Sequence, residues 1–253
     1  MSLQLLLISN STNQGEAYLE WPRPHISLFL KEKNVKRILF IPFAGVNISS
    51  EGVNPSYVQY TQKVKTVFSE LGYDVYSIVD EFDPIKAVKE AECIMIGGGN
   101  TYFLVAMLYR WKIMEPIREK LLQGTPYIGW SAGSNVACPT LRTTNDMPII
   151  QPESFNTLDL IPFQINPHYL DANPQGHGGE TREQRIMEFL AVNPLMKVAG
   201  LREATALVVE NNHLELVGTR PLRYFEYRHE PREFQPGDDL SLLMEKLHPS
   251  EIE

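Results

Sequence analysis

Short apolar runs alternate with longer amphipathic segments through the first half of the chain. Five runs are almost continuously apolar: Leu3–Ile8, Arg37–Phe43, Asp74–Val79, Cys93–Ile96 and Tyr127–Trp130. Runs of this length and character are typical of strands that are buried on both faces of a parallel sheet. The pattern therefore predicts five strands of one sheet.

The segments between these strands have helical spacing. They are Pro55–Leu71, Pro84–Ala91, Thr101–Leu108 and Ile113–Leu122. The first of them ends before Gly72, and glycine is common just past the end of a helix. Strands that alternate with helices predict an α/β fold, with a doubly wound, mostly parallel sheet and helices on both faces.

The regular alternation of strands and helices changes after Ser131. Residues 138–180 are rich in Pro, Asn, Thr and Gly, and only Pro162–Ile165 resembles a strand. A stretch of this length with little regular structure usually carries function in a compact domain.

Regular patterns return in the last third of the chain. Thr181–Val192 has helical spacing, and Ala206–Glu210 with Leu214–Val217 predicts a C-terminal β hairpin. We interpret residues 1–253 as a single catalytic domain in which residues 235–253 form a partly mobile tail.

Composition and charge narrow the range of partners. The chain has 253 residues and a formal net charge of −8, from 23 Lys+Arg and 31 Asp+Glu. This acidic balance argues against nucleic acid, because phosphate binding needs clustered Lys and Arg. The longest apolar stretch, Ile38–Val46, is well below the ~18 residues that suggest a membrane span. No basic residue precedes the N-terminal apolar run, so we expect no signal peptide and a cytoplasmic protein.

Metal and cofactor motifs are missing from the sequence. The two cysteines do not form a C-x-x-C pair, and no H-E-x-x-H motif occurs. We therefore expect neither a metal ion nor a cofactor.

The strongest local motif is Gly129-Trp-Ser-Ala-Gly133, directly after a predicted strand. A Gly-x-Ser-x-Gly turn between a strand and a helix exposes the serine hydroxyl, with glycines where side chains would clash. Ser131 is therefore the candidate nucleophile. The alternative is a simple turn without chemistry.

A serine nucleophile needs a base, and the base needs an orienting group. His168 follows a predicted strand, which is where α/β active sites collect their residues. His177 lies in the same irregular stretch, between two glycines, and is a candidate lid residue. Asp146 and Glu203 are the two candidate acids.

A glycine run, Gly97–Gly99, follows another predicted strand. It does not match a dinucleotide motif, because Tyr102 stands where the third glycine belongs, and it lacks the Gly-Lys pair of a phosphate loop. The backbone N–H of Gly98 or Gly99 could instead join that of Ala132 and bind an oxyanion. A plain tight turn is the other interpretation.

Several longer segments closely resemble the peptidase E family of α-aspartyl dipeptidases. They are Ser9–Thr12, Phe40–Gly45, Gly97–Thr101, Gly129–Pro148, Asn166–His168 and Gly178–Arg185. The resemblance follows the family's order and spacing over about residues 1–210. Residues 47–57 look longer than in bacterial members, and the region beyond about residue 220 matches poorly.

The resemblance implies an intracellular serine peptidase on a flavodoxin-like sheet, related to class I glutamine amidotransferases. It implies Ser131 as nucleophile, His168 as base and Asp146 as the third member of the triad. Glu203 ranks second, as an accessory acid. Gly99 and Ala132 would form the oxyanion hole.

The same resemblance implies a substrate: a dipeptide with N-terminal aspartate. Arg182 would bind the side-chain carboxylate, with Asn100 as a further substrate-binding residue; Arg142 and Arg185 are local alternatives. A bidentate arginine suits a carboxylate better than a lysine does. A homo-oligomer is compatible with the sequence.

Three other functions compete with this one. A general esterase shares the Ser–Asp–His order, but Asp146 follows Ser131 by only fifteen residues, too few for the strands of that fold. A β-aspartyl or cyanophycin-type peptidase of the same superfamily is a closer alternative than the esterase. A ligand-binding module without chemistry is the third, and the complete Ser–His–acid set argues against it.

Overall fold

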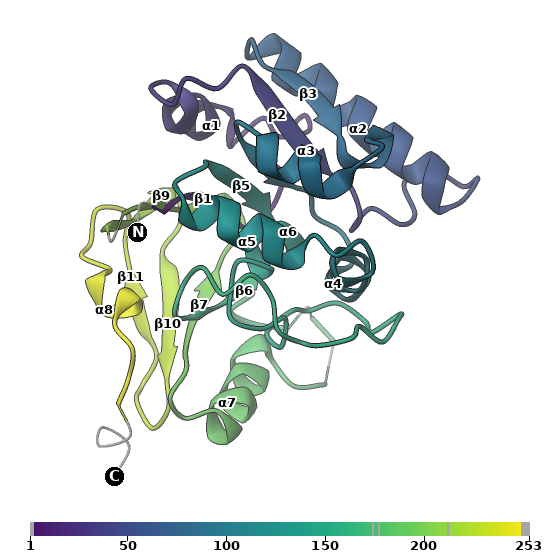
Figure 1. Ribbon diagram of the computed structural model, residues 1–253. Helices are drawn as coiled ribbons and strands as arrows, with labels where there is room; N and C mark the ends of the chain where they lie inside the picture. The colour runs from purple at the N-terminus through teal and green to yellow at the C-terminus, as the bar shows by residue number, and fades with distance from the viewer. Residues whose placement is uncertain (1–2, 174, 177, 212, 249–253) are drawn as a thin grey trace.

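Two β-sheets and the helices around them make up the fold (Figure 1). The structure is a computed structural model of the chain, and it describes residues 3–248 except 174, 177 and 212. In Figure 1 the larger sheet crosses the upper and middle parts of the molecule, and the smaller sheet lies below it with α7.

The larger sheet has seven strands in the order β3-β2-β4-β5-β1-β8-β9. Its strands are β1 (Gln4–Ile8), β2 (Arg37–Ile41), β3 (Asp74–Ser77), β4 (Ile94–Ile96), β5 (Tyr127–Trp130), β8 (Thr205–Glu210) and β9 (His213–Gly218). The first five are parallel, while β8 pairs antiparallel with β1 and forms a hairpin with β9. The predicted strands, their parallel sheet and the hairpin are confirmed.

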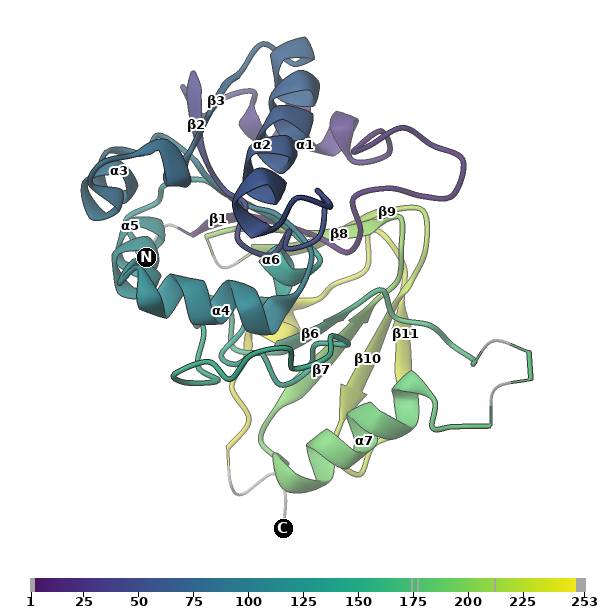
Figure 2. The same ribbon diagram turned by 90° about the vertical axis from the view of Figure 1, so that its right-hand side faces the viewer.

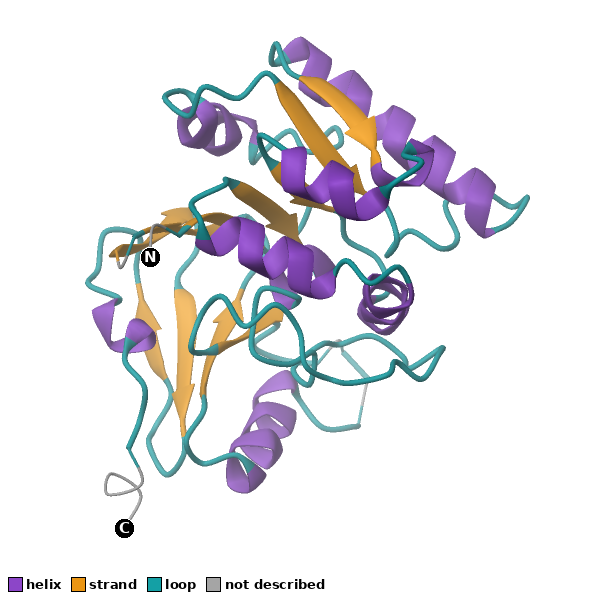
Figure 3. Ribbon diagram, viewed as in Figure 1, coloured by secondary structure: helices purple, strands orange, loops and turns teal. Residues whose placement is uncertain are grey.

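Helices cover both faces of this sheet, as Figure 3 shows in purple against the orange strands. They are α1 (Arg23–Leu30), α2 (Val53–Glu70), α3 (Pro84–Glu90), α4 (Thr101–Arg110) and α5 (Met114–Leu122), with a short 3₁₀ turn, η1 (Ile78–Asp80). Alternate side chains of each strand enter different cores, because the side-chain period of a strand is two. Leu5 and Leu7 pack with α3, α4 and α5, whereas Leu6 and Ile8 pack with α1 and α2.

The smaller sheet was not predicted from the sequence. Its four strands, in the order β11-β10-β7-β6, are β6 (Gln164–Pro167), β7 (Lys197–Leu201), β10 (Leu222–Glu226) and β11 (Arg232–Phe234). Strands β6 and β7 are parallel neighbours. Helix α7 (Arg182–Val192) packs against this sheet through Ile186 and Leu190, as the rotated view shows (Figure 2). The helical segment predicted at 181–192 is thus confirmed.

The segment after residue 235 contains a further short helix, α8 (Ser241–Met244). Leu240 and Leu243 are fully buried, and Lys197 Nζ donates hydrogen bonds to the carbonyls of Leu242 and Glu245. This part of the expected tail therefore packs against β7. Residues 249–253 lie outside the described part of the chain. Over the described residues, the helices are too short or too polar to cross a membrane.

Candidate active site

Ser131 occupies a sharp turn between β5 and the short helix α6 (Ala132–Asn135). Its φ of +53° is unusual for a residue with a side chain, and such conformations typically cost about 1–3 kcal/mol. The flanking glycines permit the turn: a Cβ on Gly133 would lie 2.1 Å from the Ile96 carbonyl oxygen, and one on Gly129 would lie 2.5 Å from that of Gly133. The sequence motif therefore forms the strained turn that a nucleophile requires.

His168 lies within hydrogen-bond distance of this serine. Its Nε2 is 2.9 Å from Ser131 Oγ. His168 directly follows β6 and has a φ of +52°, and its backbone N–H donates to Ser9 Oγ at 3.0 Å. Ser9 in turn donates to the carbonyl of Leu201 at 2.7 Å. These bonds fix the end of β6 relative to β1 and β7, and with it the imidazole.

The partner of the second imidazole nitrogen is Glu203. Its Oε1 lies 2.9 Å from His168 Nδ1. Glu203 follows β7, the parallel neighbour of β6, so the carboxyl ends of the two strands bring acid and base together. The arrangement Ser131–His168–Glu203 has the geometry of a nucleophile, a base and an orienting acid.

Asp146 makes different contacts from those predicted. Its Oδ2 accepts a hydrogen bond from the Thr101 backbone N–H at 2.7 Å and from Thr101 Oγ1 at 2.6 Å, and Thr144 Oγ1 lies at 3.0 Å. The first turn of α4 holds this carboxylate, because N–H groups and the helix dipole both favour negative charge there. The position predicted for Asp146, beside His168, is taken by Glu203.

Two backbone N–H groups lie next to Ser131. Gly99 has a φ of +138°, and a Cβ there would lie 2.1 Å from the Ala44 carbonyl oxygen. A Cβ on Gly98 would lie 2.9 Å from Ser131 Cβ, so this loop passes directly beside the nucleophile. Among the described residues, the N–H groups of Gly99 and Ala132 have no hydrogen-bond acceptor. Both are therefore available to an oxyanion.

Arg182 begins α7, at the edge of a small cavity of about 150 Å³. The cavity is lined by polar side chains that include Arg142, Asn145, Asp146, Asn166, Arg182 and Arg185. Burial and the neighbouring Arg185 lower the pKa of Arg182, and Asp146 opposes them. Within the described part of the chain Arg182 has no ion pair, whereas Arg185 pairs with Glu180 at 3.8 Å. Of these two, Arg182 is thus the better placed to bind a carboxylate. Arg142, which is exposed and lies over the Phe155 ring at 6.0 Å, also lacks an ion pair among the described residues.

Asn100 is bound at both ends of its side-chain amide. Its Oδ1 accepts the N–H of Phe103 at 3.0 Å, which caps α4, and its Nδ2 donates to the carbonyl of Met147 at 2.9 Å. These contacts connect the glycine loop, residues 97–99, to the segment that carries Asp146. A direct substrate contact by Asn100 stays a prediction. His177 lies outside the described residues.

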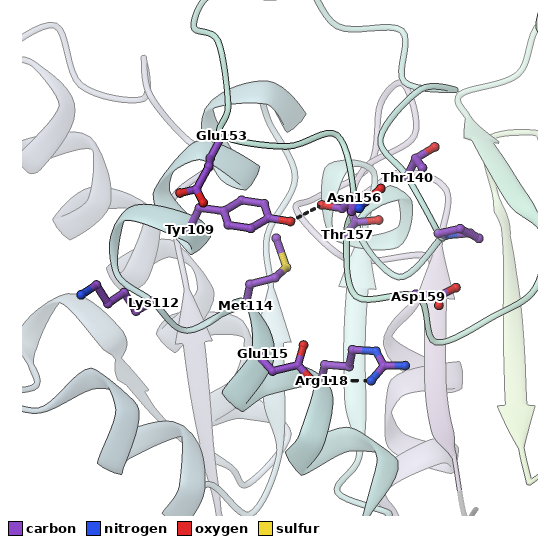
Figure 4. Close-up of a pocket in the computed structure, with 11 residues that line it drawn as sticks. Tyr109, Lys112, Met114, Glu115, Arg118, Thr140, Glu153, Asn156, Thr157 and Asp159 are labelled. Carbon is purple, nitrogen blue, oxygen red and sulfur yellow. Dashed lines mark hydrogen bonds and ion pairs between the residues drawn. The ribbon is translucent and has the colours of Figure 1, made fainter.

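A larger pocket of about 740 Å³ lies between α4, α5 and the segment 139–159 (Figure 4). None of the predicted site residues lines it. Its polar groups already interact with one another: Arg118 lies 3.6 Å from Glu115, and Tyr109 Oη donates to the Asn156 carbonyl at 3.1 Å. The volume of this pocket is therefore not evidence that it is the catalytic site.

The site combines a serine, a histidine and a carboxylate in one hydrogen-bonded chain, at the carboxyl ends of parallel strands. This arrangement defines a serine hydrolase on an α/β fold. The sequence comparison names the family. The family model for peptidase family S51 matches residues 5–217, and this chain belongs to that family.

Similar proteins cover nearly the whole chain. A peptidase E from Nostoc sp. is 48% identical over 246 residues, which are 97% of this chain and 98% of that protein. A peptidase E from Shewanella baltica is 43% identical over 244 residues, covering 96% and 99%. The resemblance to the peptidase E family is confirmed.

Two solved structures share the fold. A peptidase from an acI-B1 Actinobacterium has a TM-score of 0.69 at 18% identity, over 94% of this chain and 97% of that one. A putative peptidase E protein from Listeria monocytogenes has a TM-score of 0.65 at 20% identity, over 87% and 100%.

Proposed function

We propose that this chain is a serine dipeptidase that hydrolyses dipeptides with N-terminal aspartate through an acyl-enzyme. The observation that carries the proposal is the His168 ring, with Ser131 Oγ and Glu203 Oε1 each 2.9 Å from one of its nitrogens. Relatives named peptidase E, 41–48% identical over nearly the whole chain, support the substrate class.

Ser131 Oγ attacks the carbonyl carbon of the aspartyl residue, and His168 Nε2 accepts its proton. Glu203 holds the Nδ1–H tautomer and stabilises the imidazolium that forms. The N–H groups of Gly99 and Ala132 bind the developing oxyanion, where loss of one donor typically lowers kcat by ~10²–10³-fold. His168 then protonates the leaving amino acid, and a water molecule hydrolyses the aspartyl ester by the reverse steps.

We assign recognition of the substrate to the cavity that Arg182 lines, which Asn166, two residues before His168, also lines. The side-chain carboxylate of the substrate binds Arg182, whose guanidinium can make two parallel hydrogen bonds. Asp146 lines the same cavity with a carboxylate, which suits the α-ammonium group of the substrate. Asp146 would thus be a binding residue. An Asn-X dipeptide would leave Arg182 without its charged partner, which is unfavourable in a small cavity.

The test is parallel hydrolysis of α- and β-linked Asp-Leu, Glu-Leu and Asn-Leu by the wild-type chain and by Ser131→Ala. Cleavage of α-linked Asp-Leu that Ser131→Ala abolishes supports the proposal. Preference for the β-linked isomer favours the cyanophycin-type alternative. Hydrolysis of simple esters without dipeptides favours the esterase, and binding without turnover favours the ligand-binding module.

Arg182→Ala tests recognition, with Arg185→Ala as a matched control on the same helix. Loss of a charge-assisted hydrogen bond costs about 1.5–3 kcal/mol, so we expect kcat/KM for Asp-Leu to fall ~10–200-fold in Arg182→Ala. Arg185 is mostly exposed and should matter little. Equal effects of the two substitutions would place recognition elsewhere.

We also propose a cytoplasmic location and no nucleic-acid partner. The net charge of −8 supports the second of these, because phosphate binding needs clustered Lys and Arg. Cell fractionation and a DNA-binding assay at low salt test the two statements. A homo-oligomer stays open to measurement by sedimentation.

A further inference from the structure

Tyr60, on α2, reaches the loop that supplies the oxyanion donor. It is 5% exposed, and its Oη donates a hydrogen bond to the carbonyl oxygen of Gly98 at 2.9 Å. The same hydroxyl accepts a hydrogen bond from Nε1 of Trp130, the residue before the nucleophile, at 3.0 Å. One hydroxyl group therefore contacts both the oxyanion loop and the strand that carries Ser131.

The Gly98 carbonyl and the Gly99 N–H belong to one peptide group. A trans peptide is planar, with its C=O and N–H pointing in opposite directions. The hydrogen bond from Tyr60 holds the carbonyl toward α2, and so it holds the Gly99 N–H toward the opposite side. The proposed mechanism requires the oxyanion to form on that side, and the loop passes close to the nucleophile: a Cβ on Gly98 would lie 2.9 Å from Ser131 Cβ.

This peptide group needs an external anchor. It lies between two glycines, which have few steric limits on their backbone angles. The neighbouring N–H groups are bonded to the end of β2 and to the loop after it: Gly97 to the carbonyl of Ile41 at 3.3 Å, and Asn100 to that of Ala44 at 2.9 Å. Among the described residues, Tyr60 is the sole donor to the Gly98 carbonyl.

The surroundings fix the tyrosine ring as well. It packs edge-on against Phe40, with ring centroids 5.1 Å apart, and Phe40 stacks on Trp130 at 5.9 Å. A Cβ on Gly97 would lie 2.5 Å from Tyr60 Oη, and one on Gly45 would lie 2.4 Å from its Cδ1. Burial raises the pKa of Tyr60 to about 12, so the hydroxyl keeps its proton at neutral pH.

We infer that Tyr60 is a positioning residue of the reaction: its hydroxyl sets the direction of the Gly99 N–H relative to Ser131 and thereby supports stabilisation of the oxyanion. The inference rests on the proposed function. It assigns to α2 a part in the chemistry, although no atom of Tyr60 touches the substrate.

Tyr60→Phe removes the hydroxyl and keeps the ring. Tyr57→Phe is the matched control, because Tyr57 is on the same helix, is 4% exposed, and has a hydroxyl without a hydrogen-bond partner among the described residues. Full removal of an oxyanion donor lowers kcat by ~10²–10³-fold, so a misdirected donor should lower it by ~10–100-fold. We expect that loss in kcat for Asp-Leu in Tyr60→Phe, with KM changed less than about threefold and Tyr57→Phe close to wild type.

An aspartyl aldehyde that adds to Ser131 as a tetrahedral adduct gives a second measurement. Its affinity should fall by the same factor as kcat, because the adduct carries the oxyanion. p-Aminophenylalanine in place of Tyr60 keeps an N–H donor at this position and should restore kcat to within about fivefold of wild type. This variant decides the question if Tyr60→Phe does not fold.

The inference is overturned if kcat of Tyr60→Phe stays within twofold of the Tyr57→Phe value, or if the whole loss falls on KM. It is also overturned if the aldehyde binds unchanged, or if p-aminophenylalanine gives no recovery. A wild-type chain that cannot cleave Asp-Leu refutes the proposed function instead. In that case the same variants are compared with p-nitrophenyl acetate, whose hydrolysis needs Ser131 and the oxyanion donors but no recognition of aspartate.

Discussion

Glu203→Gln compared with Asp146→Asn separates the two carboxylates that the sequence offered as the third member of the triad. Both substitutions keep the shape of the side chain and remove one negative charge. Glu203 Oε1 lies 2.9 Å from His168 Nδ1, whereas Asp146 is held by Thr101 at the start of α4. The two changes should therefore act on different kinetic constants.

The size of the Glu203 effect follows from its distance and exposure. Two unit charges about 4 Å apart interact by ~1 kcal/mol in water and by ~4 kcal/mol at the effective dielectric constant near a protein surface. The side chains of His168 and Glu203 are 39% and 43% exposed, which places the pair between these limits. Loss of that interaction with the imidazolium alone lowers the rate by about 5–900-fold.

The amide of Gln adds a second effect. Its NH₂ group can donate to His168 Nδ1 and so favour the tautomer with the proton on Nε2, which cannot accept the proton of Ser131. In a known triad, the corresponding acid-to-amide change costs ~10⁴-fold. We expect kcat of Glu203→Gln to fall by ~10²–10⁴-fold, with KM for Asp-Leu nearly unchanged.

Asp146→Asn should act mainly on substrate binding. It removes the negative charge that lines the cavity with Arg182, and a charge-assisted hydrogen bond contributes about 1.5–3 kcal/mol. We expect KM for Asp-Leu to rise at least ~10-fold with a smaller change in kcat. Steady-state kinetics of both variants give the comparison. A Glu203→Gln variant with kcat within tenfold of wild type, beside an Asp146→Asn variant that loses kcat alone, would refute the assignment.

Three further predictions concern the turn, the ion pairs and metals. Gly133→Ala should lower kcat/KM more than ~100-fold and lower the melting temperature, because its Cβ would lie 2.1 Å from the Ile96 carbonyl oxygen. Gly178→Ala is the control, because there is open space around Gly178. Arg202→Leu should lower the free energy of unfolding by about 3 kcal/mol in a urea titration, because Arg202 is 7% exposed and paired with Glu233 and Asp171. The hydrogen bond from Arg202 lowers the pKa of Asp171; burial raises that of Glu233, but the arginine hydrogen bonds outweigh it. The stabilisation from these ion pairs should therefore be fully present above the ordinary carboxyl pKa values of 3.8 and 4.5. It should be lost as the pH falls through the lowered pKa values of the folded protein, with a weaker pH dependence in Arg202→Leu. A chelator should leave activity unchanged, and activity that returns only with added zinc or another divalent ion would contradict a pure serine mechanism.

The sequence was sufficient to predict the larger sheet and the nucleophile. Strands β1, β2, β4 and β5 are buried almost throughout, so their apolar runs are unambiguous, and Gly129–Gly133 has its full signal within five residues. His168 could be predicted because it directly follows a strand.

The third member of the triad could not be chosen in the same way. The residues alone leave Asp146 and Glu203 as candidates, and the family resemblance implies Asp146, but the acid beside His168 is Glu203, 35 residues further along the chain. What joins Glu203 to His168 is the parallel pairing of β6 and β7, which belong to a sheet that the sequence did not predict. Strands β10 and β11 of that sheet mix charged and apolar residues, as in Arg232–Phe234, so their pattern is weak.

The role of Tyr60 has the same kind of cause. A tyrosine on the buried face of an amphipathic helix is predicted as part of the core, and its ring does pack there. Its hydrogen bonds to Gly98 and Trp130 join residues 38 and 70 positions away, and no local pattern encodes such pairs. Long-range hydrogen bonds of this kind become visible only when the helix is docked on the sheet.

The net charge of −8 raises a separate question, since the proposed substrate also carries a net negative charge. Fields between exposed charges are screened over about 8 Å at physiological ionic strength, so long-range repulsion weakens before the dipeptide makes contact. What remains is the balance of charges at contact distance. Arg202 and Arg223 pair with carboxylates, whereas Arg182 lines its cavity without an ion pair among the described residues. In a chain with eight more acidic than basic residues, an arginine that has no ion pair in the described part of the chain supports the proposal that the substrate supplies the carboxylate.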